Sequence, residues 1–559
     1  MRLASIVLLA LATFAHASTA AAAESPATMV LVGKVWTADT KRPMAEAVAV
    51  RGDKIVAVGS LKHVEPFRGP ETQVIEAGEG FIVPGMIDSH IHLVDGGLQL
   101  ASVQLRGAKS REEFVGRLAK FAKTKPKGEW ITGGDWDHTL WGGELPSRDW
   151  IDAVTPDNPV WLNRLDGHMS LANTAAMKAA KVTDDVKDVM GGEIVRDAAG
   201  RPTGVFKDNA MGLVGRAEPD PSMQERLDAI VAAMDYLAAR GVTSVHHMGN
   251  WQQVELFRVA ERRGLLKTRI YACTQISDWK RLAEEVKERG KGSDWLKIGG
   301  LKGFVDGSLG SHTAAFLEPF SDSPADRGLL VNTEADLEKW TMGADQAGLQ
   351  VAVHAIGDRA IRMQLDIYER VAKANGARDR RFRIEHAQHI SPDDLPRFAK
   401  LGVIPSMQPY HAIDDGRWAE KSIGAKRCET TYAFRSLIDS GAHPAFGSDW
   451  FVAPPTPLEG IYAAVTRRTI DSKTPDGWVP QQKITVEEAL RAYTIDAAYA
   501  AFNEKTLGSI EPGKLADMVV LDQNLFEVPP NELDQVPIRK TIVGGKVVYD
   551  SATKSLKKE

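Results

Sequence analysis

The feature that most constrains the fold is an alternation of short apolar segments with longer helical ones through the middle of the chain. The apolar segments are GVTSVHHMG, LKIGGLKGFVDG, LQVAVHAIG, RFRIEHAQ, GVIPSMQP and HPAFGSDW. Stretches with helical spacing of apolar residues, such as 223–240, 279–289 and 333–347, lie between them. Repeated strand–helix units with apolar strands predict an α/β protein with parallel strands. Their number favours a (β/α)8 TIM-like barrel over an open sheet.

The two ends of the chain have a different pattern, typical of a small antiparallel sheet. TMVLVGKVWT and AVAVRGDKIVAVGS near the start, and GSIEPGKLADMVVLD and IRKTIVGGKVVYD near the end, are rich in Val and Ile and separated by turn residues. We expect both ends to meet in one small composite β-sandwich domain, built from residues 24–83 and 501–559. The barrel then takes residues 84–500.

The stretch at about 101–221 interrupts the alternation and is predicted to be an insertion in the barrel. It holds five of the thirteen tryptophans, namely Trp130, Trp136, Trp141, Trp150 and Trp161. These rings would suit the wall of a substrate pocket, but core packing of the inserted unit explains most of them equally well.

The first 23 residues have the composition of a secretory signal peptide. Arg2 precedes an apolar run from Leu3 to Ala15, and small residues lead to an Ala-x-Ala site ending at Ala23. The apolar run is shorter than the roughly 20 residues that span a bilayer, which argues against the alternative of a membrane anchor. We therefore expect cleavage after Ala23, a periplasmic or secreted location, and no membrane span after cleavage.

Composition and charge narrow the range of partners. The chain is 43% hydrophobic and 26% charged, which is ordinary for a globular protein. Its formal net charge of -5 leaves no surplus of positive charge to neutralise phosphates, so nucleic acid is not an expected partner. The two cysteines, Cys273 and Cys428, could pair after export or remain buried thiols.

Polar residues end several of the predicted strands. His90 and His92 follow the apolar run in VPGMIDSHIHL, and residues two apart in a strand share one face. Such a pair can bind a metal, or it can be two ordinary polar residues at a strand end. His354, His386 and Asp449 end three further strands. Because the carboxyl ends of parallel barrel strands meet at one rim, all five side chains could converge there.

Neutral imidazoles and a carboxylate are suitable ligands for Zn²⁺ and similar divalent ions. Such an ion lowers the pKa of a bound water to about 7, which makes hydroxide available at neutral pH. A neighbouring carboxylate could take up the remaining proton and deliver it to a leaving group. Asp449 is the candidate for this catalytic role.

These residues and their surroundings resemble the amidohydrolase superfamily. The resemblance is greater to its amidohydrolase-3 branch, the metal-dependent hydrolases related to N-substituted formamide deformylase. It covers nearly the whole chain after the predicted signal peptide. The motifs are VPGMIDSHIHL, GGDWDHTLW, LDGHMSLAN, LKGFVDGSLGSHTAA, VAVHAIGD, RIEHAQ, SMQPYHA, AFGSDW and GSIEPGKLADMVVLD. Each motif alone is modestly specific, whereas the ordered set is highly specific.

The resemblance implies one or two divalent ions, with Zn²⁺ as the default and iron, cobalt or manganese as alternatives. It assigns His90, His92 and Asp449 to a first ion, and His354 and His386 to a second.

Lys302 matches a family lysine that is often carboxylated by carbon dioxide and then bridges two metals. A lysine near cations in a dry site loses its proton more easily, and only the neutral amine reacts. A single ion beside an ordinary lysine is the alternative, since Lys297 in the same strand shows that lysine occurs there without special cause.

Other candidates come from the remaining motifs. His168 in LDGHMSLAN looks like a family position that faces the substrate. His246, His247, Asp306 and His411 are weaker candidates that could instead brace the ligands.

We expect a hydrolase that acts on a small molecule and cleaves a carbon–nitrogen bond other than a peptide bond. An amide is favoured, whether an N-acyl amine, an N-formyl amine or a cyclic amide. The alternative is a deaminase, or another hydrolase or lyase, on the same metal site. A catalytically silent binding protein on this scaffold is a third interpretation. A homodimer is a fair expectation for an enzyme of this size.

Overall fold

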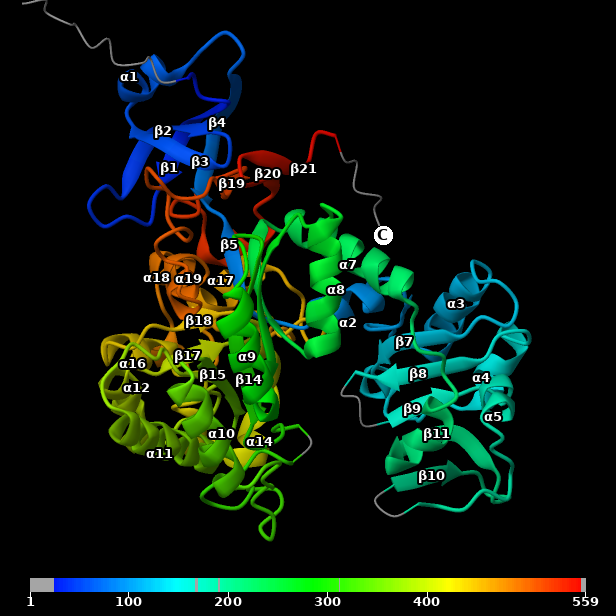
Figure 1. Cartoon of the computed structure of the whole chain (residues 1–559). Helices are drawn as coiled ribbons and strands as arrows, with labels where there is room; N and C mark the ends of the chain where they lie inside the picture. Colours follow the sequence, from blue (N-terminus) through cyan, green and yellow to red (C-terminus); the bar gives the residue numbers. More distant parts are fainter. Residues whose placement is uncertain (1–24, 166–168, 190–191, 311, 554–559) are drawn as a thin grey trace, which may run out of the picture.

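The computed structural model describes residues 25–165, 169–189, 192–310 and 312–553. The predicted signal peptide and His168 lie outside the described residues, so both remain predictions. The described chain forms a central barrel, a sheet built from both ends of the chain, and an inserted unit beside the barrel (Figure 1).

The barrel is a sheet of eight parallel strands in the order β5, β12, β13, β14, β15, β16, β17, β18. These are β5 (Met86–Ile91), β12 (Val242–Met248), β13 (Arg269–Gln275), β14 (Leu296–Phe304), β15 (Gln350–Ala355), β16 (Arg383–His386), β17 (Ile404–Met407) and β18 (Ala445–Phe446). Nearly all of their residues are buried, as expected for strands covered by helices on the outside and filled by side chains within. This confirms the predicted fold class.

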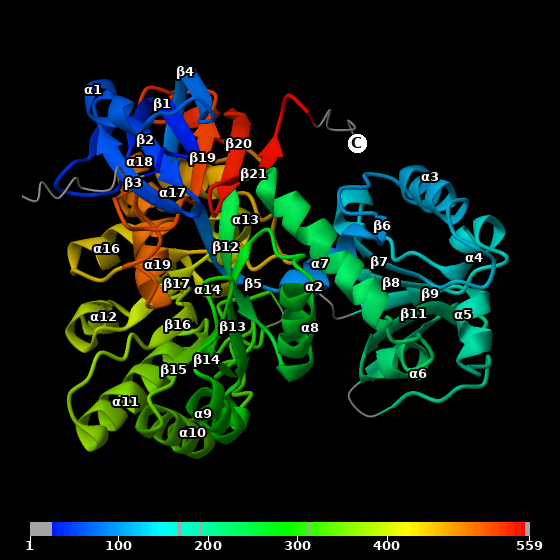
Figure 2. The same cartoon turned by 45° about the horizontal axis from the view of Figure 1, so that its top comes forward.

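Helices of the barrel lie outside the strands, as the two cartoon views show (Figure 2). They are α2 (Leu93–Leu100), α7 (Met223–Ala238), α8 (Trp251–Arg262), α9 (Trp279–Arg289), α10 (Glu334–Gln346), α11 (Asp358–Asn375), α12 (Leu395–Leu401) and α16 (Phe434–Asp439), followed by α17 (Pro457–Thr466), α18 (Val486–Ala492) and α19 (Ile495–Ala500). Several begin at a side-chain cap, and α7 has a full capping box between Ser222 and Glu225.

The barrel closes between its first strand and the segment that follows its last. The backbone N–H of Asp449 donates to the carbonyl of His90 at 2.7 Å, and that of His92 donates to the carbonyl of Trp450 at 2.8 Å. The closing hydrogen bonds therefore run through three of the predicted site residues.

Strands from both ends of the chain form a second sheet, of seven strands, in the order β21-β20-β19-β4-β1-β2-β3. They are β1 (Met29–Trp36), β2 (Met44–Arg51), β3 (Lys54–Gly59), β4 (Gln73–Pro84), β19 (Met518–Leu521), β20 (Ile538–Val543) and β21 (Lys546–Asp550). The two ends join where β4 pairs antiparallel with β19. A buried ion pair between Arg269 of β13 and Asp517 then ties this sheet to the barrel.

The segment between α2 and α7 carries a third sheet, in the order β10-β11-β9-β8-β7-β6. Its strands are β6 (Val103–Gln104), β7 (Ile131–Trp136), β8 (Val160–Arg164), β9 (Met169–Ala172), β10 (Gly192–Arg196) and β11 (Pro202–Asp208), and its longest helix is α3 (Arg111–Ala122). Trp136, Trp150 and Trp161 are buried in its hydrophobic clusters. For these three rings, core packing is therefore the correct interpretation.

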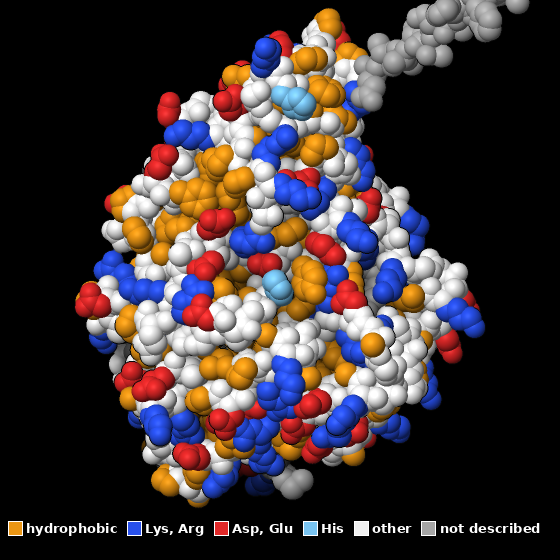
Figure 3. Space-filling view, turned by 90° about the vertical axis from the view of Figure 1, so that its left-hand side faces the viewer, with side chains coloured by type: hydrophobic (Ala, Val, Ile, Leu, Met, Phe, Trp, Pro, Cys, Tyr) orange, Lys and Arg blue, Asp and Glu red, His pale blue; other side chains and the backbone are white. Residues whose placement is uncertain are grey.

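The surface is mixed in charge. On the face drawn in Figure 3, basic and acidic side chains are interspersed, in keeping with the small net charge of the chain. Among the described residues, no helix has both the length and the apolar character needed to cross a membrane.

Candidate metal centre

The predicted ligands gather at the carboxyl ends of the barrel strands. His90 lies near the end of β5, His386 is the last residue of β16, and Asp449 lies beyond β18. His386 and Asp449 have positive φ angles of 71° and 59°. Such backbone conformations are uncommon for residues with a Cβ and concentrate at functional sites. Here they lie where two strands end at the rim of the barrel.

The first cluster contains His90, His92 and Asp449. One ligand atom from each residue lies within 4.8 Å of the other two. Oδ1 of Asp449 is 3.4 Å from Nε2 of His90 and 3.3 Å from Nε2 of His92. Two imidazole nitrogens and a carboxylate oxygen aimed at one space are the type of donor set that holds Zn²⁺ at an open, catalytic position.

The second cluster contains His386, His411 and again Asp449, with ligand atoms within the same 4.8 Å limit. His354 lies beside it, because its ring centroid is 4.5 Å from that of His386. The Nε2 atom of His354, however, contacts the carbonyl oxygen of Gly307 at 2.9 Å. The structure thus places His354 at the centre but pairs His386 with His411, which the sequence marked only as a weaker candidate.

Lys302 points to the first cluster from β14. Its Nζ is 3.3 Å from Nε2 of His90, and only 5% of the residue is exposed. Burial lowers the pKa of this lysine below its ordinary value. Lys297, five residues earlier, lies at the other end of the same strand, roughly 16 Å away at the usual rise per residue.

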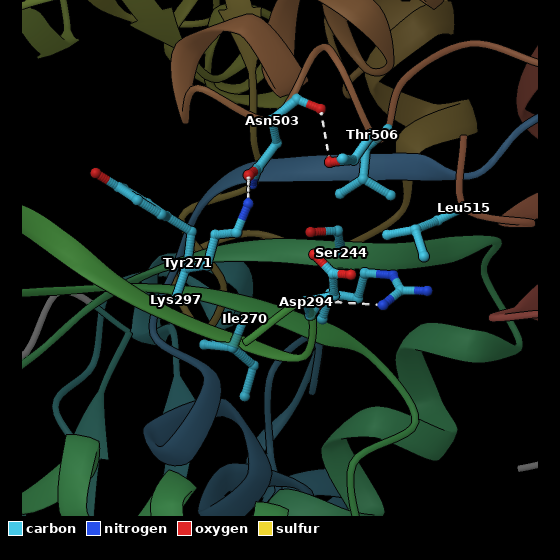
Figure 4. Close-up of a pocket in the computed structure, with 10 residues that line it drawn as sticks. Ser244, Ile270, Tyr271, Asp294, Lys297, Asn503, Thr506 and Leu515 are labelled. Atoms are coloured by element: carbon cyan, nitrogen blue, oxygen red, sulfur yellow. Dashed lines mark hydrogen bonds between the residues drawn. The ribbon is translucent and has the colours of Figure 1, made fainter. Parts of the chain in front are cut away.

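Lys297 belongs to a separate small hollow at the amino ends of β12, β13 and β14 (Figure 4). There it donates a hydrogen bond to Oδ1 of Asn503, and Ser244 and Tyr271 line the same space. The two lysines of β14 therefore have different surroundings, and only Lys302 lies at the histidine cluster.

The buried histidines of the centre are neutral at neutral pH. Burial, reinforced by the charge of Lys302, lowers the pKa of His90 to about 4 and that of His354 to about 3. The pKa of His386 is also lowered, again chiefly by burial. Burial opposes ionisation of Asp449, but the neighbouring His90 and a hydrogen bond with His92 outweigh it, so the pKa of that carboxyl lies well below its usual range. Neutral imidazoles and an ionised carboxylate are the protonation states that bind a divalent cation.

A buried carboxylate orients His90. Oε2 of Glu385 lies 2.5 Å from Nδ1 of His90, and both side chains are fully buried. Arg383 contacts both carboxylate oxygens of Glu385, at 2.7 and 3.1 Å. Burial favours the neutral acid, but Arg383 and His90 outweigh it and hold the pKa of Glu385 well below its usual range. An ionised carboxylate only accepts, so Nδ1 of His90 carries the proton and Nε2 presents its lone pair to the site.

Glu385, Arg383 and Gln408 were missed by sequence reasoning. Arg383 and Glu385 alternate in RFRIEH, and alternate residues of a barrel strand point to the same side. Charged residues at alternate positions of a strand that is predicted to be buried in a barrel are unusual enough to have indicated a buried ion pair.

The weaker candidates His246, His247 and Asp306 have structural partners. Nδ1 of His246 contacts Arg383, and Nδ1 of His247 accepts the backbone N–H of Leu93. Asp306 accepts three backbone N–H groups, from Ala315, Ile356 and Gly357. They brace the elements that carry the ligands.

The fold and the site together define a barrel-type metal-dependent hydrolase. Comparison with known proteins specifies the group further: the model of the Amidohydrolase family matches residues 73–549. The chain belongs to the amidohydrolase family.

Individual relatives cover almost the full length. The chain is 42% identical over 536 residues to the protein LONG AFTER FAR-RED 3 of Arabidopsis thaliana. The aligned region covers 93% of this chain and 91% of that protein. It is 28% identical to the N-substituted formamide deformylase of Arthrobacter pascens, over 93% of this chain and 98% of the relative. Among solved structures, an uncharacterised metal-dependent hydrolase from Pyrococcus horikoshii matches with a TM-score of 0.74 and 28% identity, over 90% of this chain and 99% of its own.

Proposed function

We propose that this hydrolase cleaves a carbon–nitrogen bond other than a peptide bond, with an amide as its substrate. The observation that carries the proposal is the convergence of His90, His92 and Asp449 within 4.8 Å, with His90 buried and neutral. The N-substituted formamide deformylase among the relatives supports an amide over other bonds.

The residues present fit a divalent cation, for which Zn²⁺ is the default. The contact with Glu385 puts the lone pair of His90 on Nε2, and Asp449 supplies a negative charge at the same point. A bound Zn²⁺ would supply a water of lowered pKa and polarise the carbonyl of the substrate. Asp449 would accept the proton of the attacking water and deliver it to the departing nitrogen, which must leave as a neutral amine.

We also propose that Lys302 is carboxylated. Its Nζ lies 3.3 Å from His90 in a buried setting, where the neutral amine that reacts with carbon dioxide is favoured. The product would be an anionic carbamate, with two oxygen atoms beside His90 that could bind a cation. This would offset the positive charge of two cations in a dry site.

Two exposed aromatic rings point to the kind of substrate. Phe304 at the end of β14 is 41% exposed and its ring centroid lies 5.4 Å from that of His354. Phe451, beyond β18, is 37% exposed and lies 6.0 Å from His92. β14 and β18 are four strands apart in the ring of eight, and each of the two aromatic rings lies beside a different histidine of the centre. We propose that they contact apolar groups on either side of the scissile bond.

The test is a substrate panel offered to the protein before and after removal of metal with a chelator. N-formyl and N-acyl amines, each in benzyl and methyl versions, would be compared with lactams and cyclic ureas. We expect release of amine plus acid, a preference for benzyl compounds, loss of turnover with the chelator and recovery when metal is returned. Release of ammonia would favour a deaminase instead, and no turnover on any compound by metal-loaded protein would contradict the proposal.

Variants test the role of the rings. Phe304→Ala and Phe451→Ala should lower kcat/KM for benzyl compounds more than for methyl ones. Phe502→Ala removes a ring of similar exposure, 38%, outside the site and serves as the control. If all three substitutions change kcat/KM equally, Phe304 and Phe451 do not recognise apolar groups of the substrate.

A further inference from the structure

His411 has a buried ring nitrogen that nothing in the described chain satisfies. It lies in the first turn of α13 (Pro409–Asp415), just after β17. Its Nε2 is shielded from solvent and has no hydrogen-bond partner among the described residues. An unsatisfied buried polar group destabilises the folded chain, so its presence calls for an explanation.

The surroundings of this ring point to a cation. A ring nitrogen of His411, a nitrogen of His386 and an oxygen of Asp449 lie within 4.8 Å of one another. The set combines two imidazole rings with one carboxylate. A set of two neutral imidazoles and one carboxylate is complementary to a divalent ion.

Gln408 sets the tautomer of His386. Its Oε1 lies 2.8 Å from Nδ1 of His386, and an amide oxygen only accepts, so Nδ1 of His386 carries the proton. The lone pair of His386 is then on Nε2. The Gln408 side chain is fully buried, and its Nε2 has no partner among the described residues, which indicates that the histidine contact determines its orientation.

We propose that His411 is a direct ligand of a second divalent cation, held together with His386 and Asp449. This inference rests on the proposed metal centre and extends it, because His411 lies outside the ligand set that the family resemblance implies. Asp449 is then shared by two cation positions, one with His90 and His92 and one with His386 and His411.

The test measures metal binding rather than turnover. Wild-type protein, His411→Ala and His411→Gln would be loaded with Co²⁺ and dialysed against graded chelator. Ions per chain would be counted by mass spectrometry, and the visible absorption of Co²⁺ would report its coordination. His443→Ala is the matched control, because His443 is an exposed histidine with 62% of its side chain accessible.

We expect two ions per chain in the wild type and in the control variant. In the His411 variants, one ion should bind at least about 10-fold more weakly, with an altered Co²⁺ spectrum. Metal-free melting curves of all variants would show that the fold is intact. If folded His411 variants keep both the affinity and the spectrum of the wild type, the inference is wrong while the proposed function stands. If the wild type binds no cation, the proposed function fails as well.

Discussion

Glu385 and His90 come from strands β16 and β5, 295 positions apart in sequence, and meet in the barrel interior with 2.5 Å between Oε2 and Nδ1. The contact determines which nitrogen of His90 faces the site. It also gives Arg383 its counter-charge, since all three side chains are fully buried. The buried ion pair between Glu385 and Arg383 therefore supports the proposed metal centre through His90, and a substitution of Glu385 would break this pair.

Glu385→Gln should weaken metal binding by about 10- to 100-fold, because an amide can donate to Nδ1 of His90 and so favour the wrong tautomer. It should also cost about 3–5 kcal/mol of unfolding free energy, since Arg383 is left as an unpaired buried charge. Metal titration and chemical denaturation measure the two effects. Glu504→Gln is the control, because Glu504 pairs with Arg381 away from the site. Unchanged metal affinity in folded Glu385→Gln would contradict the proposed orientation of His90.

Asp449→Asn tests the proton transfer. An amide cannot accept the proton of the attacking water, so we expect kcat to fall by about 10²- to 10⁴-fold. Metal content must be measured on the same sample, because Asp449 also faces both histidine clusters. Full turnover by a variant that still holds metal would rule out Asp449 as the base.

Carboxylation of Lys302 can be seen directly. Protein equilibrated with ¹³C-labelled bicarbonate should give a carbamate signal by nuclear magnetic resonance, and Lys302→Arg should abolish it. Lys297→Arg, in the same strand, should keep the signal, because Lys297 bonds to Asn503 at the opposite end of the barrel. A signal that survives in Lys302→Arg would place the modification elsewhere.

Removal of metal should destabilise the fold. A cation that binds only the folded chain stabilises it by about 2.7 kcal/mol at a concentration 100 times its Kd. The apparent melting temperature should therefore fall after chelation and recover when Zn²⁺ is returned. A melting curve that does not respond to chelator or added metal would argue against a cation at the strand ends.

The bridge between the barrel and the composite sheet can be tested separately from the site. Arg269 and Asp517 are 3% and 4% exposed and make two contacts, at 2.7 and 2.9 Å. Asp517→Ala leaves Arg269 buried without its counter-charge and should cost about 3–5 kcal/mol in chemical denaturation. Glu334→Ala breaks the exposed pair with Arg370 and should cost less than about 1 kcal/mol. If the two variants lose similar amounts of unfolding free energy, the buried pair does not hold the composite sheet to the barrel.

The barrel and the position of its polar residues could be predicted from the amino-acid sequence. Apolar strands alternating with amphipathic helices predict parallel strands covered by helices, and the number of these units favours a barrel over an open sheet. A histidine or aspartate at the end of a strand then lies at the rim whatever the details of packing. For this reason His90, His386 and Asp449 could be named as neighbours although they lie far apart in the sequence.

The groups that share a ligand position, and the side chains that orient them, could not be predicted before the chain was seen folded. Closure of the barrel places Asp449 against His90, and the first turn after β17 brings His411 beside His386. Glu385 can pair with His90 only because the side chains of these two residues, from β16 and β5, point to each other inside the barrel. These relations follow from strand stagger and helix placement, which arise from the packing of the whole chain and leave no local pattern around any one residue.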